Sequence, residues 1–126
     1  MVTKIINPNI GSNLAINTDH KKGAAGEDVE ISQTPETPDR IFVLDGIQYS
    51  YRPEAGAELL AAPIKGGIDI FVGDKLKWSA DIPDFTGVLN LYIPGQSDKT
   101  TRVILKSGGS GYIGKLNVQW HLEAAK

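Results

Sequence analysis

The chain has 126 residues, and 13 basic against 15 acidic side chains give it a formal charge of -2. This length fits a single domain, and the near balance of charge argues against a nucleic-acid-binding surface or a polybasic membrane anchor. Cysteine is absent, which excludes disulfides and thiolate metal sites. No apolar run approaches the roughly 18 residues that a membrane-spanning helix needs, so no transmembrane segment is expected.

The first 39 residues are weakly patterned. Short strands are predicted over residues 3–7 and 13–17, and no long apolar run precedes Pro8, so no signal peptide is predicted. The chain is then expected to be cytoplasmic, a mature form, or exported by a non-classical route. Residues 18–39 are polar and interrupted by glycine and proline, with only residues 28–32 resembling a strand. They predict a flexible surface loop or arm.

Residues 40–52 carry the clearest local signal. Apolar residues 41–44 run into Asp45-Gly46, and alternating residues 47–52 follow. Asp-Gly between two strand-like runs predicts a two-residue hairpin turn, because both central positions of that turn favour positive φ. Residues 54–62, between Pro53 and Pro63, are the one helical candidate, and they predict a short helical connector.

The second half alternates between apolar and polar residues. Strands are predicted at residues 68–72, 75–79, 87–93, 100–106 and 116–121, with turns at Gly73-Asp74 and at 94–98. Isoleucine outnumbers leucine, 14 to 10, which also favours strands. The sequence therefore predicts one all-β domain over residues 1–126. We expect an antiparallel β-sandwich of jelly-roll or Greek-key type.

A glycine-rich segment imitates two nucleotide-binding motifs. Residues 109–115 match G-x-x-x-x-G-K, and Gly109, Gly111 and Gly114 match G-x-G-x-x-G. Both motifs require a following helix whose N-terminus holds phosphate, whereas residues 116–122 alternate as a strand does. The segment is therefore predicted to be a flexible hairpin with a bulge at Gly114.

The sequence contains no recognisable catalytic constellation. His20 and His121 lie a hundred residues apart without a ligand-spaced partner, and both are expected at the surface. No serine stands in a strand-turn-helix elbow, so the protein is predicted not to be an enzyme. No cofactor is predicted, although Asp81 and Asp84, which Asp74 and Asp98 could join in space, leave a calcium site open.

Strand alternation predicts a polar strip on one outer sheet face. It contains Asn90, Tyr92, Asn117, Gln119 and His121, and Tyr49, Tyr51 and Arg52 are candidates for a second patch. Planar amides offer both donors and acceptors, and tyrosine offers an apolar face beside a polar tip, which suits polyhydroxylated ligands. The alternative is an ordinary solvated sheet face.

Two short segments resemble parts of known sandwich proteins. The run Gly73-Asp74-Lys75-Leu76-Lys77-Trp78 resembles a turn and strand found in sugar-binding modules and in cupredoxins, whose copper site needs cysteine. Residues 101–121 resemble the last hairpin of small toxin-component sandwiches.

Two functions remain open at this point. The first is a non-enzymatic, lectin-like binding module that recognises a glycan or another cell-surface ligand. The second is a structural subunit of a phage tail, a capsid or a toxin assembly. In that case the polar arm over residues 18–39 would order on a protein partner or in a homo-oligomer.

Overall fold

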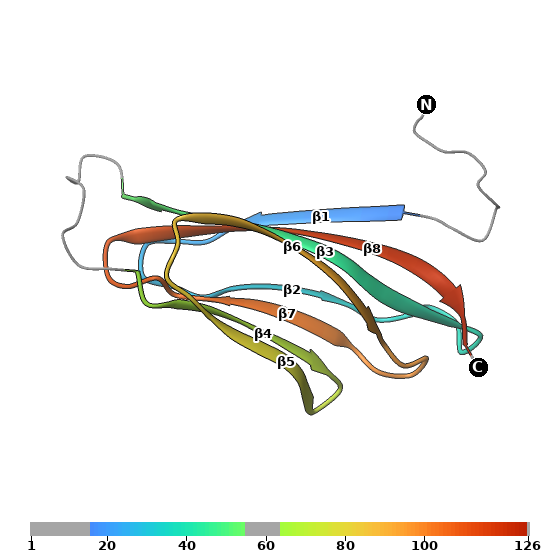
Figure 1. Ribbon diagram of the computed structural model, residues 1–126. Coiled ribbons are helices and arrows are strands. Elements are labelled where there is room, and N and C mark those ends of the chain that lie inside the picture. Colours follow the sequence, from blue (N-terminus) through green and yellow to red (C-terminus); the bar gives the residue numbers. More distant parts are fainter. Residues whose placement is uncertain (1–15, 55–63, 126) are drawn as a thin grey trace.

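The computed structural model describes residues 16–54 and 64–125, which form two packed antiparallel sheets and, within those ranges, no helix (Figure 1). The strands are β1 (Ile16–Lys22), β2 (Val29–Gln33), β3 (Arg40–Pro53), β4 (Gly66–Val72), β5 (Lys75–Ile82), β6 (Thr86–Pro94), β7 (Thr101–Lys106) and β8 (Tyr112–Ala124). The predicted all-β antiparallel sandwich is confirmed. The predicted strand at residues 3–7 lies outside the described residues, as does nearly all of the helical connector at 54–62.

The strand order is that of a jelly roll. One sheet has the order β1-β8-β3-β6 and the other β2-β7-β4-β5. The first strand pairs with the last, the second with the seventh, the third with the sixth and the fourth with the fifth. The chain is thus one long hairpin that is rolled into two sheets. Its tip is the predicted turn at Gly73-Asp74, where Gly73 has a φ of 61°.

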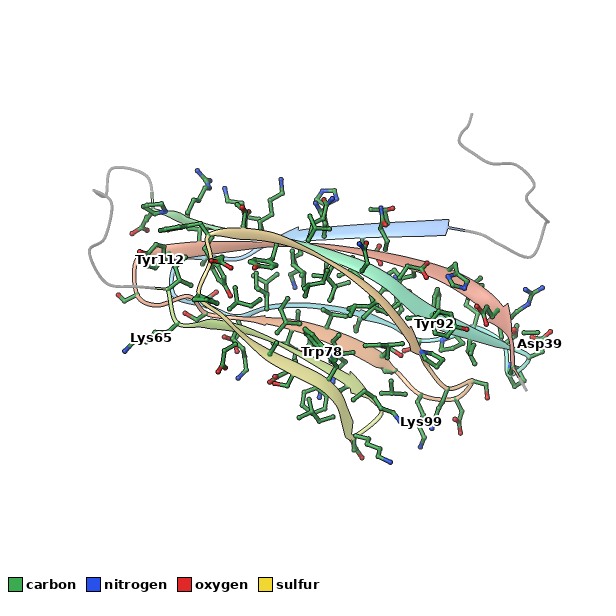
Figure 2. The ribbon with its side chains drawn as sticks, viewed as in Figure 1. Asp39, Lys65, Trp78, Tyr92, Lys99 and Tyr112 are labelled. Atoms are coloured by element: carbon green, nitrogen blue, oxygen red, sulfur yellow. The ribbon has the colours of Figure 1, made fainter. Side chains whose placement is uncertain are left out.

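The core lies between the sheets, where alternate side chains of each strand meet (Figure 2). Trp120 is the largest fully buried side chain, and the Phe42 ring contacts it edge-on at a centroid distance of 5.9 Å. The other fully buried side chains are Leu44, Ile47, Ile68, Ile70, Leu105, Leu116, Val29, Val43, Val103, Val118 and Thr101. The alternation predicted for β6 and β8 is present: Leu116, Val118 and Trp120 are buried, while Asn90 and Tyr92 are exposed.

The predicted hairpin at Asp45-Gly46 is wrong, because β3 runs straight through it. Leu44 pairs with Trp120 and Gly46 pairs with Gln119, so Asp45 is an extra residue in the ladder, a β-bulge. Both halves of β3 pair with β8 instead of with each other, from Arg40 opposite Ala124 to Pro53 opposite Tyr112. The prediction for the glycine-rich segment at residues 109–115 is also corrected. A strand follows, as predicted, but the loop crosses from β7 in one sheet to β8 in the other, and Gly114 pairs with Tyr51 in continuous register, without the predicted bulge.

The predicted polar arm over residues 18–39 contributes two strands to the sandwich, and the rest of the segment consists of the turns and loops beside them. Its first part lies in β1, paired with β8, and residues 29–33 form β2, paired with β7. Residues 18–22 of β1 were not predicted as a strand because a charged residue stands at one of the inward positions. Asp19 lies opposite Val118, whose side chain is buried. Asp19 is stabilised there by hydrogen bonds. Its Oδ2 accepts the Trp120 indole N–H at 3.1 Å and the Gln33 amide N–H at 2.5 Å.

Asp19 thereby joins the two sheets at their β1–β2 margin, and its loss should destabilise the fold. Asp19→Ala leaves the indole N–H of the buried Trp120 without its acceptor, which costs about 1–3 kcal/mol of unfolding free energy. Urea unfolding followed by tryptophan fluorescence measures this. Asp19→Asn keeps an acceptor oxygen and should recover part of the loss. Equal stability of Asp19→Ala and the wild type would show that the bridge contributes nothing.

Candidate functional site

The outer face of the β1-β8-β3-β6 sheet gathers most of the polar side chains that the sequence singled out. Outward positions on β8 are Asn117, Gln119, His121 and Glu123, and outward positions on β6 are Val88, Asn90 and Tyr92. These strands flank β3 on its two sides, so their outward side chains share one surface.

A hollow of about 110 Å³ lies in this face at the bulge. Gly46 sits at its floor, and a side chain there would approach the Leu89 carbonyl oxygen at 3.3 Å. Four amide side chains surround it, those of Gln48, Asn90, Asn117 and Gln119, with Thr18 from β1. Sequence reasoning named three of these amides and missed Gln48, although the alternation of β3 places it opposite to the inward Tyr49.

The four amides are chemically uncommitted. Within the part of the chain that the structure describes, none of them forms a side-chain hydrogen bond with another residue, and Gln48, Asn90 and Gln119 are exposed. Each amide carries two N–H donors and a carbonyl acceptor, so the hollow presents donors and acceptors to solvent.

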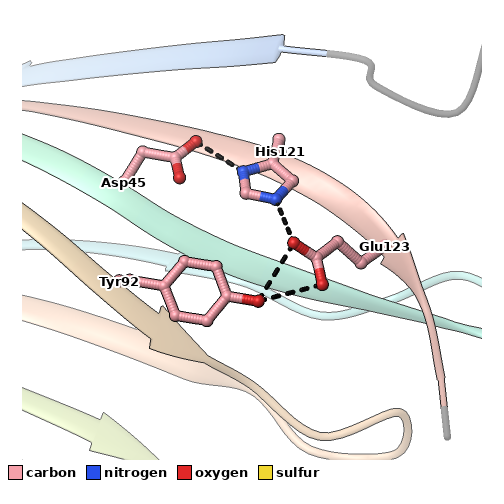
Figure 3. Close-up of polar contacts among 4 residues, drawn as sticks. All are labelled: Asp45, Tyr92, His121 and Glu123. Atoms are coloured by element: carbon pink, nitrogen blue, oxygen red, sulfur yellow. Dashed lines mark hydrogen bonds and ion pairs between the residues drawn. The ribbon is translucent and has the colours of Figure 1, made fainter. Parts of the chain in front are cut away.

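A chain of polar contacts adjoins the hollow (Figure 3). His121 Nδ1 lies 2.6 Å from Asp45 Oδ2, and His121 Nε2 lies 2.5 Å from Glu123 Oε2. The Tyr92 hydroxyl donates to Glu123, at 3.0 and 3.1 Å from its two carboxylate oxygens. Asp45 lies at the bulge, where it and Gly46 both face the side of the sheet that carries His121.

This geometry fits an imidazolium. A carboxylate only accepts hydrogen bonds, so both ring nitrogens must carry a proton to satisfy Asp45 and Glu123 together. Burial of the ring, with its side chain 12% exposed, disfavours the charge, but the hydrogen bonds and charges of the two carboxylates outweigh this and raise the pKa of His121. Hydrogen bonding to Glu123 likewise raises the pKa of Tyr92.

His121 was expected to be a surface residue without a carboxylate partner. That expectation overlooked Glu123, which is two residues away and therefore on the same face of a strand. The contact with Asp45 had no local signal, since it depends on the pairing of β3 with β8.

The predicted second patch of Tyr49, Tyr51 and Arg52 does not form. Both tyrosines point into the core, 9% and 3% exposed, whereas Arg52 is exposed on the opposite side of the same strand. The Tyr51 hydroxyl donates to the Lys106 carbonyl oxygen at 2.6 Å, and burial raises its pKa to about 12. Adjacent strand residues face opposite ways, so Tyr51 and Arg52 cannot share one surface.

No group of three or more histidine and acidic side chains within residues 16–54 and 64–125, Asp81 and Asp84 included, is arranged to hold a metal ion. In the same ranges no helix is long and apolar enough to cross a bilayer.

Comparison with known proteins gives no family. No protein-family model matches the chain, and no curated protein matches it. Among solved structures, a crystal structure of FlhE is similar over 86% of this chain and 98% of that one, with 12% sequence identity and a TM-score of 0.39. A similarity of that size carries no argument about function.

The raised pKa of His121 predicts a pH-dependent stability. A histidine whose pKa is higher in the folded state stabilises the fold fully below its unfolded value of 6.5 and loses this contribution as the pH rises through the folded pKa. Urea unfolding between pH 5.5 and 8.5 should therefore show stability falling toward high pH. His121→Gln should flatten the fall. His20→Gln, at an exposed position on β1, is the matched control and should retain it. A wild-type profile that rises with pH would contradict the assignment.

Proposed function

We propose that this protein is a non-enzymatic binding module that takes a glycan or another polyhydroxylated cell-surface ligand on the outer face of the β1-β8-β3-β6 sheet. The observation that carries the proposal is the group of four uncommitted amides around the hollow at Gly46. Sugar hydroxyls both donate and accept hydrogen bonds, and side-chain amides are their matching partners.

The dimensions favour an extended ligand that lies along the surface. A hollow of about 110 Å³ is smaller than the roughly 300–1,000 Å³ of a pocket that encloses a small molecule. A second, open groove of about 490 Å³ begins at Tyr92 and Glu123 and continues over the 94–98 turn. The two depressions follow β6, with the exposed ring of Tyr92 beside the larger one, so a chain of sugar units could contact both.

The state of His121 supports a binding role over a catalytic one. Both of its ring nitrogens are held by carboxylates, so neither is free to take a proton from a substrate. The rival role, a structural subunit of a larger assembly, was based on a polar arm over residues 18–39. Strands β1 and β2 order parts of that segment within the domain itself, which weakens this support.

Binding to a glycan array, followed by calorimetry on the glycans that bind, tests the proposal. Asn117→Ala/Gln119→Ala should weaken binding about tenfold or more, because each lost hydrogen bond contributes about 0.5–1.5 kcal/mol and 1.4 kcal/mol is tenfold in Kd. Ser32→Ala, exposed on the other sheet, should leave the Kd unchanged.

Calorimetry repeated with calcium and with a chelator should give the same Kd, since the amides need no metal to bind hydroxyls. An array on which no glycan binds would remove the proposal. A glycan that binds equally well to the double variant would move the site elsewhere.

A further inference from the structure

Strand β6 differs from the other sheet edges in carrying no charge. The described residues place β1 and β6 at the edges of one sheet and β2 and β5 at the edges of the other (Figure 1). Charged residues occur in β1, β2 and β5, where they oppose pairing with another chain. The β6 sequence, Thr-Gly-Val-Leu-Asn-Leu-Tyr-Ile-Pro, has none over nine residues, and only its terminal Pro94 is a residue that blocks an edge.

The backbone of β6 presents a regular set of groups on its open side. The Tyr51 N–H donates to the Phe85 carbonyl at 2.7 Å, and the Gly95 N–H donates to the Phe42 carbonyl at 2.8 Å. Odd-numbered residues of this segment therefore bond β3 at both ends. The β3–β6 register shifts between Ile93 and Asn90, but the burial of β6 side chains alternates without a break across the shift. Bonded residues alternate along an antiparallel strand, so the even-numbered residues 86 to 94 turn their backbone groups away from β3. These are also the residues whose side chains lie on the outer face.

The exposed apolar side chains of β6 are arranged symmetrically. Val88 is 64% exposed and Tyr92 is 61% exposed, and each lies two residues from Asn90. A two-fold axis at Asn90 would pair this strand with itself, and Val88 would then lie opposite the partner's Tyr92.

We propose that β6 pairs antiparallel with β6 of a second copy of this chain, with the two-fold axis at Asn90. A β-branched residue opposite an aromatic one stabilises a ladder, and the two Asn90 amides can hydrogen-bond each other across the axis. Backbone groups of residues 88, 90 and 92 bond those of the partner, and the two sheets become one continuous sheet of eight strands.

A second copy of the chain fits this edge because two antiparallel copies of β6 place chemically matching side chains opposite each other. Apolar side chains meet apolar ones, an amide meets an amide, and no pair of like charges is created. The interface is isologous, so it closes at two copies and does not propagate into a fibre. It also places two copies of the hollow at Gly46 on one face. The dimer does not depend on the proposed function, since it needs no ligand.

Sedimentation equilibrium over a range of concentrations tests the dimer, with circular dichroism to confirm folding. The wild type should dimerise as concentration rises. Asn90→Asp and Asn90→Lys each place like charges opposite each other at the axis and should weaken association at least tenfold. An equimolar mixture of the two variants should dimerise again. Thr18→Asp, which adds a charge on the β1 edge, is the matched control and should associate as the wild type does.

A wild type that stays monomeric at the highest soluble concentration would overturn the proposal. So would a dimer that survives Asn90→Asp, because the interface would then lie elsewhere. Since the chain has no cysteine, Asn90→Cys provides a second test of the register. Oxidation should link two copies through this position far more efficiently than through Thr18→Cys, and equal linking of both would contradict the axis.

Discussion

The ladder between β3 and β8 is the constraint on which the rest of this protein depends. It is the longest pairing in the structure, running from Arg40 opposite Ala124 to Pro53 opposite Tyr112, and it lies at the centre of its sheet. Strands of that length fix which side chains face inward, because a slip of one residue would move every core side chain to the solvent. Trp120 and Leu44 face each other inside the core for this reason, and His121 is held outside it.

The bulge at Asp45 is the one interruption of this ladder, and both surface features of interest lie beside it. Before the bulge the even residues of β3 face inward, and after it the odd residues do, as Leu44 and Ile47 show. The change requires two consecutive residues on the outer side. One is Asp45, whose carboxylate reaches His121, and the other is Gly46, whose missing side chain leaves the hollow. If the register of residues 40–44 had continued without a bulge, Gly46 would face the core and the floor between the amides would be missing.

The sequence was informative wherever a strand has one buried and one solvated face. The alternation in β6 and β8 predicted the buried Trp120 and the outward Asn90, Tyr92, Asn117 and Gln119. It failed where the pattern depends on a distant partner. Asp45-Gly46 has the same local chemistry in a hairpin turn and in a bulge, and only the availability of β8 as a partner for both halves of β3 decides between them. Asp19 has the local character of a loop residue, because its two partners, the indole of Trp120 and the amide of Gln33, are distant in the sequence.

The two outer faces of the sandwich use their polar groups differently. On the β2-β7-β4-β5 sheet the outward side chains bind one another. Arg102 lies 3.5 Å from Glu30 and over the ring of Phe71, and Lys106 lies 3.5 Å from Asp69, which also accepts the Ser79 hydroxyl.

Such pairs at an exposed surface add little stability individually, but they leave few donors or acceptors for a ligand. The amides of the opposite sheet are uncharged and hold no such partners among the described residues. Polar atoms kept free in this way contribute nothing to the fold. Their concentration on one face, around Gly46 and next to the uncharged strand β6, is the observation on which the proposed ligand site rests.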